Sequence, residues 1–323
     1  MEMPSSLQEA IIYFANPENC NKFLADLRWT DGRARCPYCG SDNITYLVRQ
    51  NRYKCYGKHP KAQFSLKVGT IFEDSPIGLD KWLCALWLIV NCKNGISSCE
   101  IARDLKITQK SAWFLDHRLR FALHQGSFEN LLSGEVEADE TFIGGKARNM
   151  HIEKRARRIT GTGTTDKTAV MGILQRGGKV RTSVVPNRKK KTLQAEIKKH
   201  VEAGSALYTD FLLSYEGLAG DYAHQVVDHA VQYVDGKIHT NGLENFWSLL
   251  KRGINGTYVS VEPFHLFRYL DEQAYRYNNR KSEQGKPLTD FDRFKLACSN
   301  IIGKRLTWNQ LTGKDPEEQT QTD

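Results

Sequence analysis

The spacing of three cysteines near the N-terminus constrains the fold of this chain more than any other feature. Cys36 and Cys39 form a Cys-x-x-Cys pair that ends in Gly40, and Cys55 follows Cys39 after fifteen intervening residues. Three thiolates and one imidazole complete a tetrahedral zinc site, and this spacing is typical of a zinc ribbon. Because the usual second Cys-x-x-Cys pair is incomplete here, His59 is the candidate fourth ligand, while a plain buried or redox cysteine pair is the alternative.

The chain has no obvious targeting or membrane segment. The longest apolar run, Trp82 to Val90, has nine residues, well under the roughly 18 that a spanning helix needs. The first residues carry neither a basic stretch nor a long apolar stretch, as a secretory signal would. We therefore expect a cytoplasmic protein, associated with the nucleoid if it binds DNA, in which cysteines serve as metal ligands or core residues.

The positive charge of the chain is concentrated in one segment. The net charge is +9, with 46 Lys and Arg against 37 Asp and Glu. Residues 143–200 carry 16 basic and 3 acidic side chains, whereas residues 1–142 carry 17 of each and residues 201–323 carry 13 basic and 17 acidic. A local excess of +13 indicates a surface that meets phosphates, although a solvated basic insertion is the simpler alternative.

A helix-turn-helix is predicted within residues 96–113. A serine cap starts the first helix, a short turn ends at a threonine, and a second helix follows that exposes Gln109 and Lys110 at its start. In this motif the start of the second helix contacts DNA bases, and Arg118 and Arg120 are candidates for phosphate contacts. Helical pairs of this kind also serve simply as packing units, so the alternative stays open.

Strands and helices alternate after residue 134. The expected order is strand, strand, strand, helix, strand, helix, strand, helix, which is the order of the RNase H-like fold. The second and third strands form a hairpin at Gly177 and Gly178. The expected ranges are a strand from 135, strands 168–174 and 179–185, a helix 191–201, a strand 206–210, a helix 212–218, a strand 223–227 and a long helix starting near 240.

These patterns predict a multidomain α+β protein: a zinc ribbon, a helical helix-turn-helix region and an RNase H-like mixed-sheet catalytic domain. The predicted boundaries are an N-terminal helical segment 1–25, the zinc ribbon 26–74, the helix-turn-helix region 76–130, the catalytic domain 134–280 and a C-terminal extension 281–323 whose tail is expected to be disordered.

Three acids stand in the right elements of this fold to form a catalytic triad. Asp139 lies in the first strand, Asp210 ends the fourth strand 71 residues later, and Glu244 lies on the last helix after a further 34 residues. Three carboxylates suit two Mg²⁺ (or Mn²⁺) ions about 4 Å apart, as two-metal phosphoryl transfer requires. Lys251, two turns after Glu244, and its neighbour Arg252 would contact the bound DNA.

The sequence resembles the insertion-sequence DDE transposases of bacteria, in the group that carries an N-terminal zinc ribbon. The resemblance runs from about residue 8 to 280. It places the catalytic acids on Asp139, Asp210 and Glu244, and because members differ at the third position, Asn241, one turn earlier, is an alternative. The motifs that carry it are Cys36-Pro-Tyr-Cys39-Gly40, Phe64-Ser-Leu-Lys-Val-Gly-Thr-Ile-Phe72, Asp139-Glu-Thr-Phe-Ile-Gly-Gly-Lys146, His239-Thr-Asn-Gly-Leu-Glu-Asn-Phe-Trp247 and Arg276-Tyr-Asn278.

The resemblance implies a reaction and its partners. Water would cut the 3′ ends of a mobile DNA element, and each freed 3′-OH would attack target DNA in the same site without a covalent protein intermediate. Joining two ends implies a homodimer or higher synaptic assembly on double-stranded DNA, with terminal inverted repeats read by the ribbon and the helix-turn-helix. Phosphates would be held by basic residues of the central segment, namely Lys154, Arg155, Arg157, Arg158, Arg188, Lys189, Lys190 and Lys191.

Two other functions fit the same residues. A transposase-derived regulator would bind terminal DNA but cut nothing in Mg²⁺. An RNase H-like nuclease or junction resolvase would cleave without joining strands and would have less need of the ribbon. A small-molecule zinc hydrolase is disfavoured, because a four-ligand zinc site has no open position.

Overall fold

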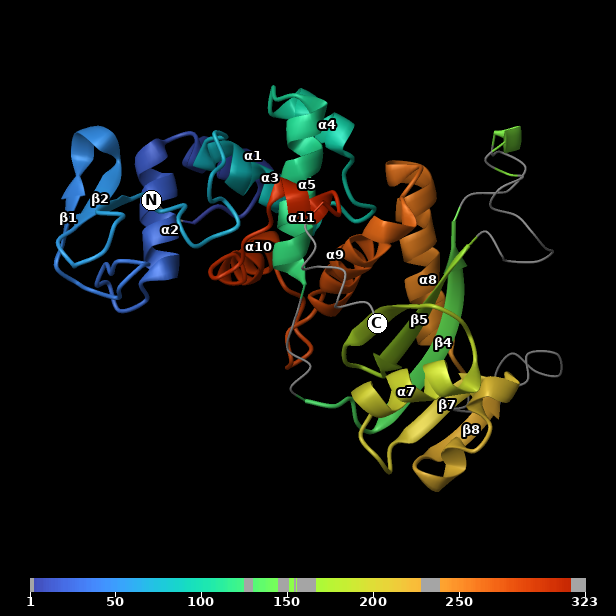
Figure 1. Cartoon of the computed structure of the whole chain (residues 1–323). Coiled ribbons are helices and arrows are strands. Elements are labelled where there is room, and N and C mark those ends of the chain that lie inside the picture. Colours follow the sequence, from blue (N-terminus) through green and yellow to red (C-terminus); the bar gives the residue numbers. More distant parts are fainter. Residues whose placement is uncertain are drawn as a thin grey trace. The chain divides into compact units, whose positions relative to one another are not determined.

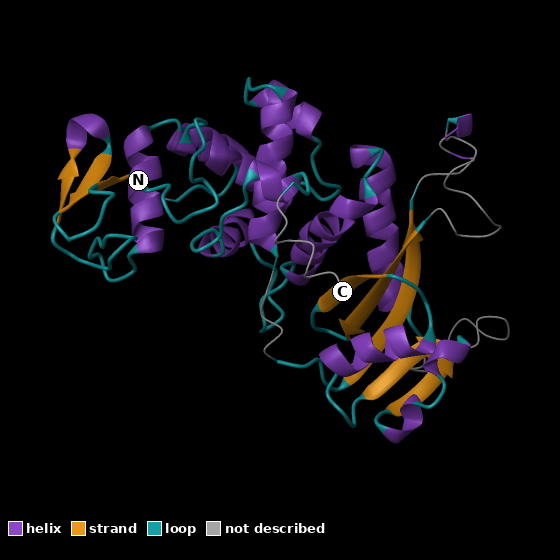
Figure 2. Ribbon diagram, viewed as in Figure 1, coloured by secondary structure: helices purple, strands orange, loops and turns teal. Residues whose placement is uncertain are grey.

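The computed structural model describes residues 3–124, 130–144, 151–153, 155, 167–227 and 239–314. The chain divides into two compact units, which are coloured along the sequence in Figure 1 and by secondary structure in Figure 2. One unit comprises Met1–Leu123 and Leu288–Asp323, and the other comprises His124–Pro287. Among the helices in these described ranges, none is long and apolar enough to cross a membrane.

The first unit begins with two helices and a small antiparallel sheet. Its elements are α1 (Leu7–Phe14), α2 (Pro17–Arg28), β1 (Ile44–Leu47), β2 (Arg52–Cys55) and β3 (Gln63–Phe64). Each helix starts at a side-chain cap, because Ser6 and Asn16 accept backbone N–H groups of the first turns. The sheet has the order β1-β2-β3, so the segment predicted to be a zinc ribbon does contain a three-stranded sheet.

Helices complete the first unit, and the C-terminal region contributes two of them. The helices are α3 (Leu79–Asn91), α4 (Ser98–Asp104), α5 (Gln109–Leu123), α10 (Asp290–Ser299) and α11 (Trp308–Leu311). Phe294 of α10 packs against Phe14, Phe23 and Trp87, with ring centroids 5.2 to 5.6 Å apart. The predicted C-terminal extension therefore supplies core residues up to α11, and the predicted tail from Asp315 lies outside the described residues.

The second unit is built on a five-stranded mixed sheet of RNase H-like topology. Its strands are β4 (Glu135–Ile143), β5 (Thr168–Gln175), β6 (Val180–Val185), β7 (Ala206–Asp210) and β8 (Ala223–Val227), in the order β6-β5-β4-β7-β8. The first three strands pair antiparallel, and β4, β7 and β8 pair parallel. Gly177, with φ of 71°, forms the turn between β5 and β6, as the predicted hairpin requires.

The connection from β7 to β8 corrects one prediction. A helix was expected over 212–218, but the chain forms two separate 3-10 turns, η3 (Leu213–Tyr215) and η4 (Leu218–Gly220). Gly217 between them has φ of 88°, a left-handed conformation that interrupts any helix. This short connection leaves Leu213 at the surface, 70 % exposed, directly after the strand that carries Asp210.

Helices cover both faces of the sheet, as Figure 2 shows. On one face, α7 (Lys190–His200) packs against β5 and β6. On the other lie α8 (Asn241–Gly253), which continues into the π-helical turn η5 (Ile254–Tyr258), and α9 (Leu266–Asn278), which follows the 3-10 turn η6 (Pro263–His265). Successive strand residues point to opposite faces, so Val136 and Ala138 of β4 join the α7-side core and Asp139 faces α8.

Candidate active site and zinc centre

Asp139 and Asp210 stand side by side on neighbouring parallel strands. The register of β4 and β7 pairs Glu137 with Tyr208 and Ala138 with Thr209, so the next step along both strands brings Asp139 beside Asp210. Adjacent strands are about 4.8 Å apart, and both side chains leave the sheet on its α8 face. Two carboxylates from distant parts of the sequence therefore lie where the parallel pairing of β4 and β7 ends, at the edge formed by the C-terminal end of β7.

Trp247 of α8 holds the Asp139 carboxylate. Its indole Nε1 donates a hydrogen bond to Asp139 Oδ2 at 2.9 Å, and the N–H of Glu140 donates to Oδ1 at 2.8 Å. The indole reaches this position because Gly172, which pairs with Asp139 across β4 and β5, has no side chain. A Cβ at Gly172 would lie 2.5 Å from Cζ2 of Trp247. The orientation of Asp139 thus depends on a glycine and a tryptophan from two other elements.

Glu244 brings a third negative charge to this edge. It lies in the first turn of α8, three residues before Trp247, and its side chain is exposed. Burial, together with the charges of Asp210 and Glu244, raises the pKa of Asp139 to about 6, and the hydrogen bond from Trp247 opposes the shift. Asn241, the alternative third residue, is exposed at the first position of the same helix.

The carboxylate oxygens of the three acids lie farther apart than the ligands of one fully coordinated metal ion. Within the described residues, Asp139, Asp210 and Glu244 do not form a set whose ligand oxygens all lie within 4.8 Å of one another. Their charges nevertheless act on one another, since both Asp210 and Glu244 shift the pKa of Asp139. Hard carboxylate oxygens that repel one another at a sheet edge are a donor set that suits divalent cations such as Mg²⁺.

Glu140 lies on the opposite face of β4 and is separate from these acids in its contacts. Tyr215 donates a hydrogen bond from its hydroxyl to Glu140 Oε1. Burial, together with the charges of Asp210 and Asp139, raises the pKa of Glu140 to about 8. The Asp139-Glu140 pair in the sequence therefore divides into one acid on the α8 face and one buried acid on the α7 face.

The predicted zinc ligands come together in the first unit. Ligand atoms of Cys36, Cys39, Cys55 and His59 all lie within 4.8 Å of one another. Cys36 Sγ lies 3.4 Å from His59 Nε2, and Cys39 Sγ lies 3.6 Å from Cys55 Sγ. In a tetrahedral zinc site with Zn–S of about 2.3 Å, ligand atoms lie about 3.6 to 3.8 Å apart. The four groups therefore fit a structural zinc ion, and His59 takes the fourth position.

Most of the residues predicted to contact DNA lie on the surface. Gln109 and Lys110 are exposed at the start of α5, where Gln109 bonds Ser98 and the Lys110 ammonium lies 4.9 Å from the ring centre of Trp308. The other described candidates are all exposed, at the start of α7, at the end of α8 and at one isolated position: Arg188, Lys189, Lys190, Lys191, Lys251, Arg252 and Arg155. Lys154, Arg157 and Arg158 lie outside the described residues.

Arg118 and Arg120 do not fit the prediction that they contact DNA. They are only 3 % and 1 % exposed. Arg118 donates a hydrogen bond to the backbone oxygen of Glu73 at 2.6 Å, and its guanidinium lies 5.2 Å from the ring centre of Trp82. Burial lowers the pKa of Arg118 to about 10. Both arginines belong to the interior of the first unit, so neither is available to phosphates in this structure.

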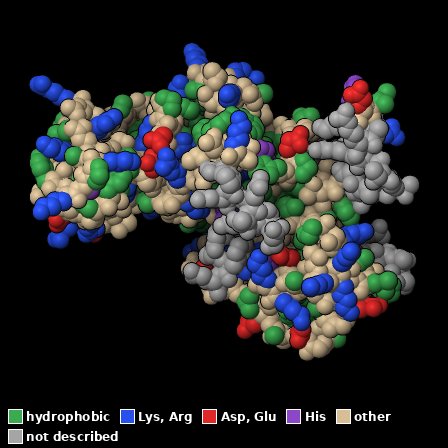
Figure 3. Space-filling model, viewed as in Figure 1, with side chains coloured by type: hydrophobic (Ala, Val, Ile, Leu, Met, Phe, Trp, Pro, Cys, Tyr) green, Lys and Arg blue, Asp and Glu red, His purple; other side chains and the backbone are tan. Residues whose placement is uncertain are grey.

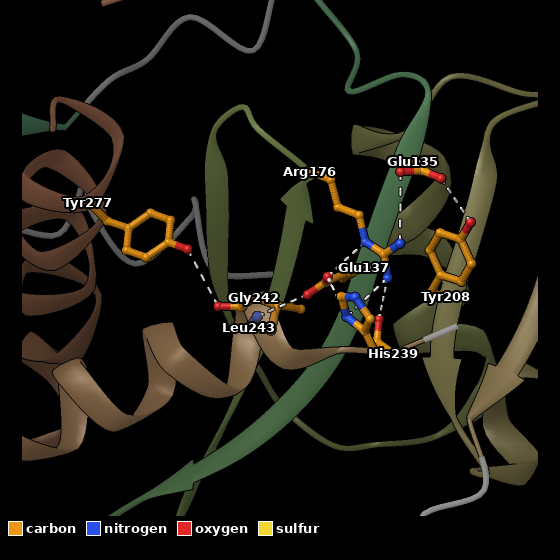
Figure 4. A network of polar contacts seen from close by, with 8 residues as sticks. All are labelled: Glu135, Glu137, Arg176, Tyr208, His239, Gly242, Leu243 and Tyr277. Atoms are coloured by element: carbon orange, nitrogen blue, oxygen red, sulfur yellow. Dashed lines mark hydrogen bonds and ion pairs between the residues drawn. The ribbon is translucent and has the colours of Figure 1, made fainter. Parts of the chain in front are cut away.

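Two polar residues beside the acids, Glu137 and Arg176, were not predicted from the sequence. Glu137 is 1 % exposed and lies two residues before Asp139, hence on the same face of β4. Its Oε1 accepts a hydrogen bond from Arg176 Nε at 2.9 Å, and Figure 4 shows this pair beside the first turn of α8. The alternation of acids along β4 was the available signal, because residues two apart in a strand share a face.

A zinc ribbon in the same chain as an RNase H-like domain is the arrangement of one class of protein, the transposases of insertion sequences. Family comparison agrees with that class in both parts of the chain. Residues 131–278 match the ISXO2-like transposase domain, and residues 15–57 match the transposase zinc-ribbon domain. The chain belongs to this family of insertion-sequence transposases, which confirms the resemblance carried by its motifs.

Two relatives support the same assignment. An uncharacterized protein in the transposable element ISH50 of Halobacterium salinarum is 27 % identical over 257 residues, covering 75 % of this chain and 84 % of the relative. An uncharacterized transposase-like protein of Haemophilus influenzae is 33 % identical over 102 residues, covering 31 % of this chain and 82 % of the relative.

Proposed function

We propose that the protein cuts the ends of a mobile DNA element and joins the freed 3′ ends to target DNA, using Asp139, Asp210 and Glu244. The observation that carries the proposal is the edge where Asp139 and Asp210 leave adjacent parallel strands beside the first turn of α8. Burial and the charges of Asp210 and Glu244 keep the pKa of Asp139 near 6, so a divalent cation would relieve the repulsion there.

The three carboxylates would hold two Mg²⁺ or Mn²⁺ ions. Such ions activate the attacking oxygen and stabilise the leaving oxygen in phosphoryl transfer. Asp139 can still serve as a ligand while bonded to Trp247 and to the Glu140 N–H, because each carboxylate oxygen offers two lone pairs. The task of Trp247 and Gly172 is to fix the direction in which the Asp139 carboxylate points.

Double-stranded DNA is the proposed partner, with phosphates held by the basic surface at the start of α7. Arg188, Lys189, Lys190 and Lys191 are exposed there, and Lys and Arg side chains cover the region of Figure 3 where α7 lies in Figure 1. The guanidinium carbon of Arg188 lies 4.7 Å from the ring centre of Phe142, so this cationic run lies beside β4. Lys251 and Arg252 extend the proposed DNA-binding surface along α8, and Gln109 and Lys110 would read terminal repeats.

A cleavage and joining assay tests this function. The substrate is a duplex carrying the inverted repeat that flanks the gene, mixed with a supercoiled plasmid as target. We expect wild-type protein with Mg²⁺ to cut the 3′ end and join it to the plasmid, and Asp139→Asn and Asp210→Asn to bind the duplex without cutting it. Cutting without joining would instead indicate a nuclease, and binding without cutting would indicate a regulator. Normal cleavage by either variant would refute the proposed triad.

The third position has its own comparison. We propose Glu244 over Asn241, because the charge of Glu244 acts on Asp139 and Glu244 lies one turn from Trp247, which bonds Asp139. Glu244→Gln should abolish cleavage at saturating Mg²⁺, whereas Asn241→Ala should retain most of it. The reverse result would transfer the role to Asn241. The same assay run on mixed wild-type and inactive chains reports whether a homodimer or higher assembly carries out the reaction.

A further inference from the structure

Arg176 connects the three elements that carry the proposed triad. It follows directly after β5, and its side chain is 16 % exposed. Its Nε donates to Glu137 of β4 at 2.9 Å, and its Nη2 donates to the backbone oxygen of His239 at 2.6 Å, just before α8. Its guanidinium carbon lies 4.1 Å from the ring centre of Tyr208 in β7. Figure 4 shows the contacts with Glu137 and His239, together with an ion pair to Glu135, converging on the Arg176 side chain.

The strand contacts of Arg176 lie one layer below the catalytic acids. Glu137 and Tyr208 face each other in the parallel register of β4 and β7. Each lies two residues before a proposed catalytic acid, so it shares that acid's face at a distance of about 6.6 Å along the strand. A side chain that contacts both Glu137 and Tyr208 therefore sets the relation between β4 and β7 directly beneath Asp139 and Asp210.

The same pair also fixes the start of α8. Thr240 precedes the helix but makes no side-chain cap hydrogen bond. Glu137 Oε2 accepts the N–H of Leu243 at 3.0 Å instead, so a buried carboxylate from another element satisfies a free N–H of the first turn, where negative charge is favoured. Close approach requires Gly242, because a Cβ there would lie 2.8 Å from Glu137 Oε2 and 2.4 Å from Leu174 Cδ2.

We propose that Arg176 and Glu137 are positioning residues that hold Glu244 against Asp139 and Asp210 and thereby set the divalent-metal affinity of the site. We call the two residues the α8 clamp. This proposal rests on the proposed function, because its test measures cleavage of DNA as a function of the metal concentration. In it, Glu137 orients the first turn of α8, Arg176 neutralises Glu137 and ties it to the segment before the helix, and neither residue contacts metal or DNA. Changes to residues that orient metal ligands typically lower metal affinity or activity about 10- to 100-fold.

The test measures the metal dependence of the complex between the full chain and its end duplex. Arg176→Met keeps an apolar stem and removes the guanidinium. We expect it to raise the Mg²⁺ or Mn²⁺ concentration for half-maximal cleavage about tenfold or more, with duplex affinity unchanged. Arg181→Met is the matched control, because Arg181 lies on β6 and bonds Asn130 outside the triad-bearing strands; it should leave the metal midpoint at the wild-type value.

A second variant keeps the test decisive if Arg176→Met does not fold. Gly242→Ala leaves both clamp residues in place but pushes the first turn of α8 away from Glu137, and it should shift the metal midpoint in the same direction. A wild-type metal midpoint in folded Arg176→Met or Gly242→Ala would overturn the clamp. If the wild-type complex cuts nothing, the proposed function fails on its own, and Mn²⁺ binding measured by electron paramagnetic resonance then decides the clamp by the same criterion.

Discussion

A glycine makes room for one of the contacts in the proposed active site. Gly172 lies opposite Asp139 across β4 and β5, and the space that it leaves is filled by the indole of Trp247, which bonds the Asp139 carboxylate. From the sequence, Trp247 was identified only as the last residue of the motif that begins at His239. Its polar role depends on a cross-strand neighbour 75 residues earlier, which no local pattern reveals.

Gly172→Ala tests this arrangement. Since the added Cβ would lie 2.5 Å from Trp247, we expect overpacking to lower the free energy of unfolding by about 1–3 kcal/mol, and the displaced indole to release Asp139 and slow cleavage. Urea unfolding and cleavage rates measure the two effects. Gly220→Ala is the control, because a Cβ at Gly220 meets nothing within 4 Å. Equal behaviour of the two variants would contradict the account.

The pKa of Asp139 sets a pH dependence for metal binding. Burial raises that pKa to about 6 in the metal-free protein, so below pH 6 the folded protein carries a proton that a cation must displace. We expect the apparent Mn²⁺ affinity to be level above about pH 7 and to fall by about tenfold per pH unit below 6. Calorimetric titrations between pH 5 and 8 measure it, and an affinity that stays constant across this range would argue against Asp139 as a ligand.

Among the helices and strands, those whose formation depends on nearby residues were predicted correctly from local sequence patterns. The strands 206–210 and 223–227 and the helix beginning after Thr240 appear where the sequence placed them. The helix expected over 212–218 does not form, because the left-handed Gly217 divides the segment into two short turns. Glycine is costly within a helix, and the helix expected over 212–218 contained Gly217 within it.

We expect the zinc ribbon to depend on a bound zinc ion for its folded structure. The sheet of β1, β2 and β3 is short, and Cys36, Cys39, Cys55 and His59 enclose the site at its end. We expect about one zinc per chain by metal analysis, and loss of that zinc in Cys36→Ser together with melting of the ribbon, because the binding free energy of a structural zinc is folding free energy. Cys99→Ser, at an exposed cysteine of α4, should retain the zinc. A chain purified without zinc that keeps a folded ribbon would refute this prediction.

At the scale of the whole molecule, the net charge of +9 is an average over unlike parts. Within residues 167–200, the longest described part of the basic segment, four consecutive exposed cations, Arg188 to Lys191, lie at the start of α7. Replacing Lys189, Lys190 and Lys191 with alanine should reduce the slope of log affinity for DNA against log salt by about 0.9 for each phosphate that the variant no longer neutralises. Lys198→Ala is the control, because Lys198 pairs with Asp221 at 2.8 Å; an equal change in slope would argue against a specific basic surface.

The sequence did not predict the positions of side chains whose hydrogen-bond partners lie far away along the chain. A basic residue on a helix has the same sequence pattern whether solvated or buried, so Arg118 and Arg120 were placed at DNA, although Arg118 bonds a backbone oxygen 45 residues earlier. Arg176 bonds Glu137 across 39 residues and His239 across 63. By contrast, the strand order expected from the sequence put Asp139 in the first strand and Asp210 at the end of the fourth, and these two strands do pair in parallel.

The most direct test of the central claim is where the metal binds. Anomalous diffraction from crystals of the protein–DNA complex grown in Mn²⁺ locates the ions without reference to activity. We expect manganese within about 2.5 Å of carboxylate oxygens of both Asp139 and Asp210, with the Glu244 side chain turned toward the same site. Crystals of Asp139→Asn should show no manganese peak there. Manganese bound elsewhere, or a complex with DNA that holds none between these two aspartates, would contradict it.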